Sequence, residues 1–272
     1  MIWTKRNPAK SKARGFENRR LLTLVLVGAL VWSVGSINWG DGVVHTGGGG
    51  SLKDFIWALF PPELSLSFLQ TALIASWQTV AYAVAGITLA VLMGLPLGII
   101  ASGSLAQSSR TRIAMVTSVR FLLAATRSIH ELIWAVLFVA AFGLSSLAVI
   151  LAIAIPYAGI LGRIYSELLN DVPEEPLRAL RSAGASPVRV LLYGRFQIML
   201  GDLISYSFYR LECAIRAAAI MSFVGIQGLG YEIQLSLNDL LFNEVWTLLL
   251  FLVVLVLLVD YWSTRVRRSL AS

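Results

Sequence analysis

Two long stretches of this chain contain no charged side chain. One runs from Leu64 to Ser109 and the other from Leu132 to Gly162. Each is longer than the roughly 20 residues with which a helix crosses a bilayer. Backbone amides find no water inside lipid, so stretches this rich in Leu, Ala, Val and Ile have to form helices there. The chain is therefore predicted to be an all-α, polytopic membrane protein rather than a soluble globule.

Apolar segments elsewhere bring the prediction to six transmembrane helices. They are approximately Leu21 to Ile37, Ser76 to Ile100, Met115 to Phe142, Ser146 to Leu161, Leu203 to Val224 and Val245 to Trp262. No small-x-small cleavage site follows the first one, so we expect an uncleaved anchor rather than a signal peptide. The predicted parts are a basic tail (1–20), a first helix with a linker and a short interfacial helix (21–70), a core of five helices including the loop 172–200 (71–264), and a second tail (265–272).

The distribution of charge predicts the orientation. The formal net charge is +7, and most of the 22 lysines and arginines flank span ends that share one side, whereas Lys53 falls on the other side. Positively charged flanks are retained in the cytoplasm. We therefore expect a protein of the cytoplasmic (inner) membrane with both termini in the cytoplasm. Because the charges follow the spans, they indicate topology and not a nucleic-acid partner.

Motifs that carry chemistry are scarce. The glycines from Gly47 to Gly50 are interpreted as a flexible linker, because no phosphate loop with its lysine occurs in the chain. The single cysteine, Cys213, and the histidines His45 and His130 do not have the spacing of a metal site. No nucleophile is paired with a base. We expect a non-catalytic chain that binds no cofactor or metal, with any ATP and Mg held by a partner subunit.

The segment 172–200, between the fourth and fifth spans, is patterned as a helix–turn–helix. Acidic residues and prolines favour a helix start, a glycine suits the turn, and a serine before a proline suits the cap of a second helix. These residues are Pro173, Glu174, Glu175, Pro176, Gly184, Ser186 and Pro187. The first helix is predicted to run from Pro176 to Ala183. A plain re-entrant or surface loop of the same composition is the alternative.

This loop resembles the EAA coupling loop of ABC importer permeases, in which a short helix docks into a groove of the cytoplasmic ATPase. Two more motifs are similar to the phosphonate permease family of that superfamily. One is Arg127-Ser128-Ile129-His130-Glu131-Leu132-Ile133-Trp134-Ala135, and the other comprises Ser205-Tyr206-Ser207-Phe208-Tyr209-Arg210-Leu211-Glu212, Arg216 and Gly225-Ile226-Gln227-Gly228-Leu229-Gly230. The likeness covers roughly Trp77 to Trp262, with the three motifs in the expected order.

The chain departs from the family pattern at several positions. Arg178 stands where the coupling motif begins with glutamate, and Leu180 replaces its second alanine. His130 replaces a proline in the third span. Glu174 or Glu175 could supply the missing acidic charge of the coupling motif. The electrostatic detail of the implied ATPase contact therefore differs from that of the family.

The resemblance implies a type I ABC importer permease that passes a phosphonate or a related phosphorus oxyanion. The implied partners are a second copy of the chain, a cytoplasmic ABC ATPase dimer, an extracytoplasmic substrate-binding protein and the lipid bilayer. The implied ATPase-coupling residues are Glu174, Glu175, Arg178, Ala179, Gly184, Ala185 and Ser186. Phosphonate, phosphite and phosphate ester are not distinguished by these residues.

Charged residues inside the predicted spans form a second group. Each costs at least ~2.5 kcal/mol at the centre of a bilayer, so it is expected to face protein or water. Arg127 and Glu131 are four apart, as are Glu212 and Arg216, so each pair can neutralise itself on one helix face. Helix packing and a role in the pathway are both open. The predicted pathway or gate residues are Arg127, Glu131, Tyr206, Arg210, Glu212, Arg216, Gly225, Gly228 and Gly230.

Two other functions fit the same composition. The chain could be a permease for another small solute, because the arginines that would bind an oxyanion are offset by glutamates. It could also be a proton-coupled secondary transporter, with Glu131 and Glu212 carrying protons. Such transporters are often built from internal repeats, and the sequence has no clear repeat. A dependence of uptake on ATP rather than on the proton gradient separates the two mechanisms.

Overall fold

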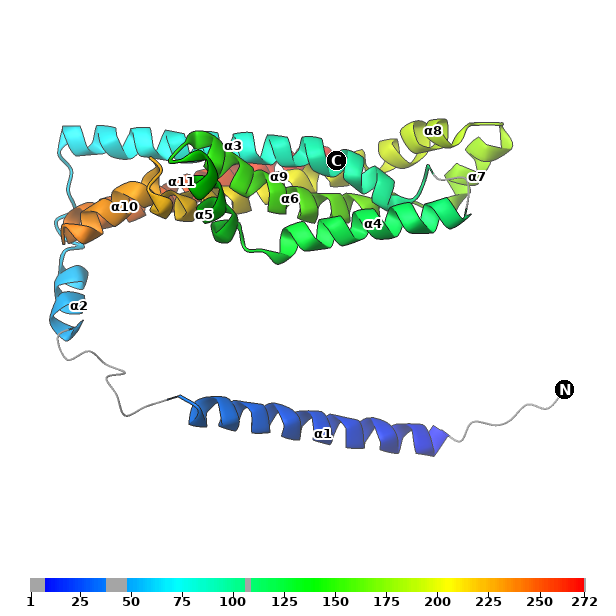
Figure 1. The fold of residues 1–272 in the computed structure, drawn as a ribbon, viewed down its shortest axis with the longest axis horizontal. Coiled ribbons are helices and arrows are strands. Elements are labelled where there is room, and N and C mark those ends of the chain that lie inside the picture. The colour runs from blue at the N-terminus through cyan, green and yellow to red at the C-terminus, as the bar shows by residue number, and fades with distance from the viewer. Residues whose placement is uncertain (1–7, 38–47, 106–108, 272) are drawn as a thin grey trace. The chain divides into compact units, whose positions relative to one another are not determined.

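The computed structural model describes residues 8–37, 48–105 and 109–271, and within these ranges the regular elements are all helices. Figure 1 shows long helices joined by short connections. The chain divides into two compact units, Met1–Ile56 and Trp57–Ser272. Each unit is described by itself.

The first unit contains α1 (Pro8–Gly35) and most of α2 (Gly48–Trp57). The predicted first span lies in α1 apart from its last residues, and the apolar side chains of α1 from Leu21 to Val34 are exposed within this unit. The linker predicted at the glycines is corrected in part, because Gly48 to Gly50 form the first turn of α2. Gly47 lies outside the described residues.

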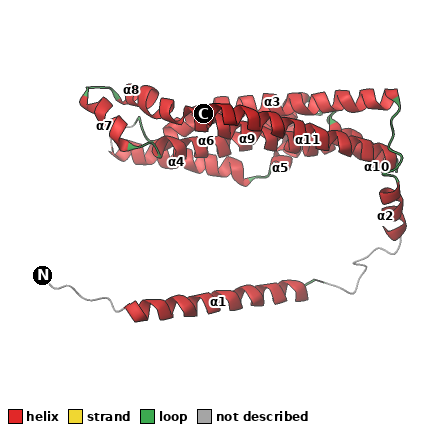
Figure 2. Ribbon diagram, turned by 180° about the vertical axis from the view of Figure 1, so that it is seen from behind, coloured by secondary structure: helices red, strands yellow, loops and turns green. Residues whose placement is uncertain are grey.

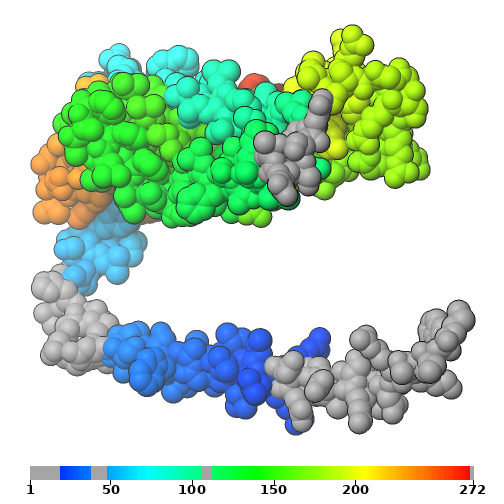
Figure 3. Space-filling model, turned by 45° about the vertical axis from the view of Figure 1, so that its right-hand side comes forward, coloured from blue at the N-terminus to red at the C-terminus, as the bar shows by residue number. Residues whose placement is uncertain are grey.

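The second unit is a bundle of helices with one short helical hairpin at an end. Its elements are α3 (Leu66–Ser102), α4 (Ser109–Ser128), α5 (Glu131–Phe142), α6 (Ser146–Asn170), α7 (Glu174–Ser182), α8 (Pro187–Arg189), the π-helical turn η1 (Val190–Arg195), α9 (Phe196–Met221), the 3-10 turn η2 (Ser222–Val224), α10 (Leu229–Asn238) and α11 (Phe242–Ala271). Figures 1 and 3 show α7 and α8 together at one end, and Figure 1 places α10 at the opposite end.

The close packing of α3 against α6 forms the centre of this bundle, and it is the most extensive helix pair among the described residues. Two glycines four residues apart on α3 permit the approach. A Cβ atom at Gly94 would lie 3.1 Å from the carbonyl oxygen of Ala158, and one at Gly98 would lie 2.8 Å from that of Gly162. Small residues at this spacing let backbones meet in membrane helices. Around them Ile153, Leu161 and other apolar side chains form the core.

Three helices are long and apolar enough to cross a membrane: α3, α6 with Asp171, and α11 to Ser269. Two bent helix pairs, α4 with α5 and the segment 187–224 with α10, raise the number of candidate spans in the described residues to as many as five, if each pair is counted as one span. These correspond to the second to sixth predicted spans. The first predicted span, which lies in α1, stays a prediction.

The third predicted span is not continuous, which corrects the expectation of one helix from Met115 to Phe142. The α4 helix ends at Ser128, α5 begins at Glu131, and the two are bent by 86°. At the break, Nδ1 of His130 accepts a hydrogen bond from the Leu132 amide at 3.2 Å and so caps α5. The indole of Trp134 donates to the Thr126 carbonyl at 3.3 Å and ties the two helices together. Figure 2 shows the break from behind.

The glycines of α3 give the first testable prediction. Replacing Gly98 by Ala places a methyl group against the backbone of α6, so the helices have to separate, and overpacking of this kind typically costs about 1–3 kcal/mol. We expect a lower Tm of the detergent-solubilised full-length protein. Gly28→Ala is the matched control, since nothing lies within 4 Å of a Cβ at Gly28. A Gly98→Ala protein that melts like the unmodified chain would contradict this packing.

Candidate functional site

The predicted helix–turn–helix is present at one end of the bundle. The first helix, α7, begins two residues earlier than predicted and ends at Ser182. It stops because Gly184 adopts a left-handed conformation with φ of 79°, which lets the Ala185 amide donate to the Leu180 carbonyl at 3.0 Å. The Ser186 hydroxyl then accepts a hydrogen bond from the Arg189 amide at 3.5 Å and caps α8.

One face of α7 is anchored to the base of α9. Leu177 is fully buried and packs with Val172 and Val190. A Cβ at Gly194 in η1 would lie 2.8 Å from a methyl carbon of Leu177, so the turn fits closely against α7. Leu177 therefore fixes α7 to the η1 turn, which leads directly into α9.

The charged residues of α7 divide into two groups. Glu174 accepts a hydrogen bond from Arg181 at 3.1 Å and lies 3.8 Å from Arg195, so its charge is used within the chain. The Arg195 guanidinium also donates to the Leu169 carbonyl and to the Asn170 side chain. By contrast Glu175, Arg178 and Ala179 are exposed on the outer face of the helix. Glu174 and Glu175 could each replace the missing acidic residue and both are exposed, but among the described residues only Glu174 has an ion pair within the chain.

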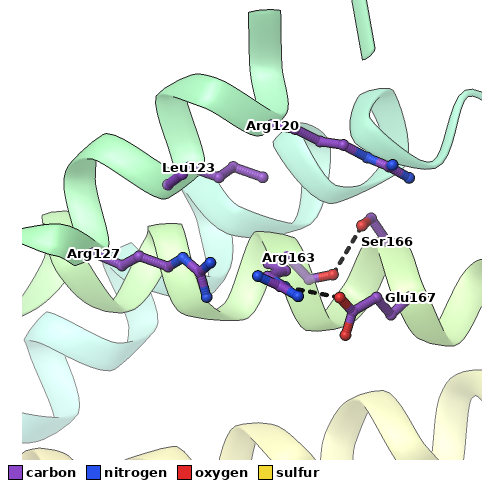
Figure 4. Close-up of a pocket in the computed structure, with 7 residues that line it drawn as sticks. Arg120, Leu123, Arg127, Arg163, Ser166 and Glu167 are labelled. Carbon is purple, nitrogen blue, oxygen red and sulfur yellow. Dashed lines mark hydrogen bonds and ion pairs between the residues drawn. The ribbon is translucent and has the colours of Figure 1, made fainter. Parts of the chain in front are cut away.

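A second feature is a cavity of about 330 Å³ between α4 and α6, shown in Figure 4. Arginines from both helices face this space. The cavity is lined by Arg120, Leu123, Ala124, Arg127, Arg163, Ser166 and Glu167. A neighbouring hollow of about 610 Å³ shares Arg127, Arg163 and Glu167 and reaches Arg210 of α9. Three helices thus direct cationic side chains to one region.

The arginines of this region are held to different degrees. Nε of Arg163 donates to Glu167 at 2.7 Å, and both side chains are about half exposed, at 51% and 50%. Nε of Arg120 donates to the carbonyl of Ala101 at 3.2 Å, at the end of α3. Among the described residues, the side chain of Arg127 has no hydrogen bond or ion pair. Guanidinium nitrogens therefore remain open to another group.

Arg210 is held by two tyrosines on its own helix. The hydroxyl of Tyr206 accepts hydrogen bonds from Nε and Nη2 of Arg210 at 3.2 and 2.7 Å. The guanidinium also lies 5.2 Å from the Tyr206 ring centre and 5.5 Å from that of Tyr209. Such cation–π contacts orient an arginine without neutralising its charge. The structure thus brings Arg210 and Tyr206 together, as the sequence predicts, and places Arg127 beside the same hollow.

The predicted pairing of Arg127 with Glu131 is wrong, because the break between α4 and α5 puts them on helices bent by 86°. Glu131 instead lines a third cavity, of about 210 Å³, with His130, Tyr157, Cys213 and Arg216 among its lining residues. In this cavity the closest ion-pair contact of Glu131 is to Nε2 of His130, at 4.0 Å.

The predicted pairing of Glu212 with Arg216 is also wrong. Glu212 accepts a hydrogen bond from Arg267 of α11 at 2.9 Å, and its side chain is only 11% exposed. Arg216 donates instead to the sulfur of Cys213 at 3.6 Å. Glu212 therefore joins α9 to α11, and it is not among the residues that line the arginine-lined hollow.

Gly225 and Gly228 lie in a tight turn between η2 and α10, and Gly230 is in the first turn of α10. Gly225 has φ of 100° and Gly228 has φ of 158°, so both favour glycine. A Cβ at Gly230 would overlap the carbonyl oxygen of Ala219 at 1.9 Å, and the Leu229 amide donates to Thr79 at 3.0 Å. The sequence predicts a sharp turn here, and the structure has one. Its role as a gate stays a prediction.

Sequence reasoning missed four polar residues of the cavity, Arg120 of α4 and Arg163, Ser166 and Glu167 of α6. Arg163 falls just beyond the predicted fourth span, which ends at Leu161, and it was interpreted as a cytoplasmic flank. The α6 helix continues to Asn170, so Arg163, Ser166 and Glu167 lie on a helix and line the cavity beside α4. The available signal was the spacing of Arg163 and Glu167, four residues apart.

Comparisons with known proteins agree on one family. Residues 94–272 match the model of the binding-protein-dependent transport system inner membrane component. The phosphite transport system permease protein PtxC of Stutzerimonas stutzeri is 34% identical over 191 residues, covering 70% of this chain and 68% of that protein. The phosphate-import permease protein PhnE of Mycolicibacterium smegmatis is 28% identical over 193 residues, covering 71% of this chain and 36% of that protein.

Solved structures show the same fold. A structure of the MetNI methionine ABC transporter in an inward facing conformation covers 76% of this chain and 99% of its own, with a TM-score of 0.68 and 21% identity. An amino acid ABC transporter covers 75% and 96%, with a TM-score of 0.64 and 16% identity. The bundle of the second unit therefore has the same fold as these chains of ABC transporters.

The Glu212 contact gives the second prediction. Arg267→Gln leaves a nearly buried carboxylate without its partner, and breaking a buried pair costs about 3–5 kcal/mol when one partner is removed. We expect a marked loss of Tm in detergent that the double variant Glu212→Gln, Arg267→Gln partly restores. Arg216→Gln is the matched control and should melt near the unmodified chain. A larger loss in Arg216→Gln than in Arg267→Gln would restore the pairing first predicted from spacing.

Proposed function

The chain belongs to the family of binding-protein-dependent transport system inner membrane components and is a permease subunit of the ABC importer type, and we propose that it carries a phosphorus oxyanion. The relatives named for phosphite and phosphate transport support this substrate class. The observation that carries the proposal is the convergence of Arg127, Arg163 and Arg210 on one hollow between three helices. Guanidinium groups bind phosphorus oxygens through paired, charge-assisted hydrogen bonds.

The exposure of these arginines supports a homodimer. In one copy of the chain the hollow that Arg127, Arg163 and Arg210 line is open, and Arg163 is half exposed. Guanidinium groups inside a bilayer are costly and face protein or water rather than lipid. We propose that this face meets a second copy and that the substrate passes between the two. Six spans per copy, with α1 as the first and both termini in the cytoplasm, complete the arrangement.

The α7–α8 segment is proposed as the ATPase docking element. The exposed residues Glu175, Arg178 and Ala179 suit contact with another protein, whereas Leu177 ties the helix to η1 and α9. In the proposed cycle, ATP and Mg are held by a partner ATPase dimer whose closure moves α7 and, through α9, the arginine-lined hollow. A loaded extracytoplasmic binding protein delivers the substrate to the open side. Binding has to differ between the two states for ATP to drive transport.

The geometry disfavours the rival mechanism of proton-coupled transport. Of the two glutamates that such a transporter would use, Glu212 is paired with Arg267 at 2.9 Å. This leaves Glu131 as the one predicted proton carrier without a close arginine partner among the described residues. A chain of exchanging carboxylates is the usual device of proton relays. Glu212 contacts an arginine and not another carboxylate, so it does not form such a chain.

Transport assays give the third prediction. The chain is reconstituted in liposomes with its ATPase and its binding protein, and uptake of labelled phosphite, methylphosphonate and phosphate is measured with and without ATP. We expect uptake of at least one of them to require ATP and to continue in the presence of a protonophore. Methionine is the control solute and should not be taken up. Uptake without ATP that a protonophore abolishes would show secondary transport instead.

The docking element gives the fourth prediction. Ala179→Glu adds a charged side chain to the exposed face of α7, so we expect the ATPase to co-purify poorly. Disrupting the centre of an interface costs about 2 kcal/mol or more, which corresponds to a binding constant more than tenfold weaker. Asn238→Glu, exposed at the end of α10, is the matched control. Normal ATPase recovery with Ala179→Glu, together with loss in Asn238→Glu, would place the docking surface elsewhere.

A further inference from the structure

We propose that the cavity between α4 and α6 is a discrete binding site for a dianionic phosphorus oxyanion, distinct from the arginine and tyrosines of α9. The ligand class in this proposal rests on the proposed function. The new element is a defined anion-binding site along the proposed pathway. The residues that would hold the ligand are Arg120, Arg127 and Arg163. Glu167 would set how tightly they do so.

The first argument is the number of unused donors. Nε of Arg163 is occupied by Glu167, and Nε of Arg120 by the Ala101 carbonyl, but the structure gives neither arginine a contact through its terminal nitrogens. Arg127 has no hydrogen bond or ion pair among the described residues. Each Nε contact fixes the direction of its guanidinium and leaves the terminal nitrogens free for the cavity. Donors oriented in this way lose little further freedom when an oxyanion binds.

The second argument is charge. Three guanidinium groups and one carboxylate line the cavity, which leaves two positive charges uncompensated. Arginines this close together repel one another in a medium less polar than water, so the group favours a ligand that brings two negative charges. Monosubstituted phosphorus oxyanions carry a charge of about −1.5 to −2 near pH 7. A singly charged anion would neutralise only half of the excess.

The third argument is size and position. The volume of about 330 Å³ exceeds that of a bare oxyanion and leaves room for bound water or a small organic substituent. Arg127 and Arg163 also line the larger hollow that reaches Arg210. An anion moving between the two spaces would therefore stay in contact with these arginine side chains. Leu123 lines the cavity and closes one side of it by packing against Gly162 of α6. The cavity therefore adjoins the proposed pathway and has a closed side.

Glu167 has a specific part in this site. Its carboxylate orients Arg163 and lowers the net positive charge, and a transport site has to bind weakly enough to release its ligand. Replacing Glu167 by Gln should therefore tighten the binding of the anion. A residue that only supported the fold would not produce this effect, because damage to the fold weakens binding.

The test is equilibrium binding of radiolabelled inorganic phosphate to the full-length chain, without its ATPase, in nanodiscs of phosphatidylcholine alone. We expect saturable binding by the unmodified chain. The dissociation constant should rise about tenfold or more in Arg163→Gln and in Arg127→Gln, since each removes a charge-assisted contact. It should fall in Glu167→Gln. Arg268→Gln, which removes an exposed arginine from the end of α11, is the matched control and should leave the constant unchanged.

Several results would overturn the proposal. These are an absence of saturable binding, unchanged binding in both arginine variants whose Tm is normal, or weaker binding in Glu167→Gln. Added phosphatidylglycerol that displaces phosphate competitively would assign the cavity to a lipid headgroup and also overturn the proposal. ATP-driven uptake with no arginine-dependent binding refutes this site and leaves the proposed function standing. Arginine-dependent binding without any ATP-driven uptake of phosphorus oxyanions upholds the site and refutes the proposed function.

Discussion

The main constraint on this structure is that arginine side chains on apolar membrane helices have to be kept away from lipid. A guanidinium group facing lipid is costly, so each one has to find an anion, a ring, a carbonyl or water. Arg267 forms an ion pair with Glu212, and Arg210 makes cation–π contacts with two tyrosines. Arg163 forms an ion pair with Glu167 while about half of its side chain stays exposed. Arg120, Arg127, Arg163 and Arg210 lie around the adjoining spaces between α4, α6 and α9. The larger of these spaces is the hollow where we propose that an anionic substrate passes.

The helix arrangement creates this space by two local devices. Glycines on α3 bring it against α6, and Gly159 of α6 makes a close approach to Leu123 and Thr126 of α4. The break at His130 then turns α5 away, so the end of α4 that carries Arg127 stays open instead of continuing as one apolar rod. At the other end, Leu177 and Gly194 link α7 to α9. The proposed docking helix is therefore packed against the start of the helical segment that carries Arg210.

The sequence predicted what is set locally and failed where partners come from distant segments. The apolar runs predicted α3, α6 and α11, and the turn and cap residues around Gly184 and Ser186 predicted α7 and α8. Spacing along one helix suggested that Glu212 pairs with Arg216, but the partner is 55 residues away on α11. The break at His130 was missed because the apolar residues before and after it add up to the length of a single span. The cavity residues of α6 were missed because the predicted helix ended too early.

The central claim is that the arginine-lined face borders a water-filled pathway rather than lipid or a dry packing contact. Cysteine accessibility tests it directly, in a Cys213→Ala background that removes the single native thiol. In nanodiscs, a charged, membrane-impermeant thiol reagent should label Arg163→Cys rapidly and should spare Leu257→Cys, which lies on the exposed apolar face of α11. Rapid labelling at Leu257→Cys with none at Arg163→Cys would contradict the account.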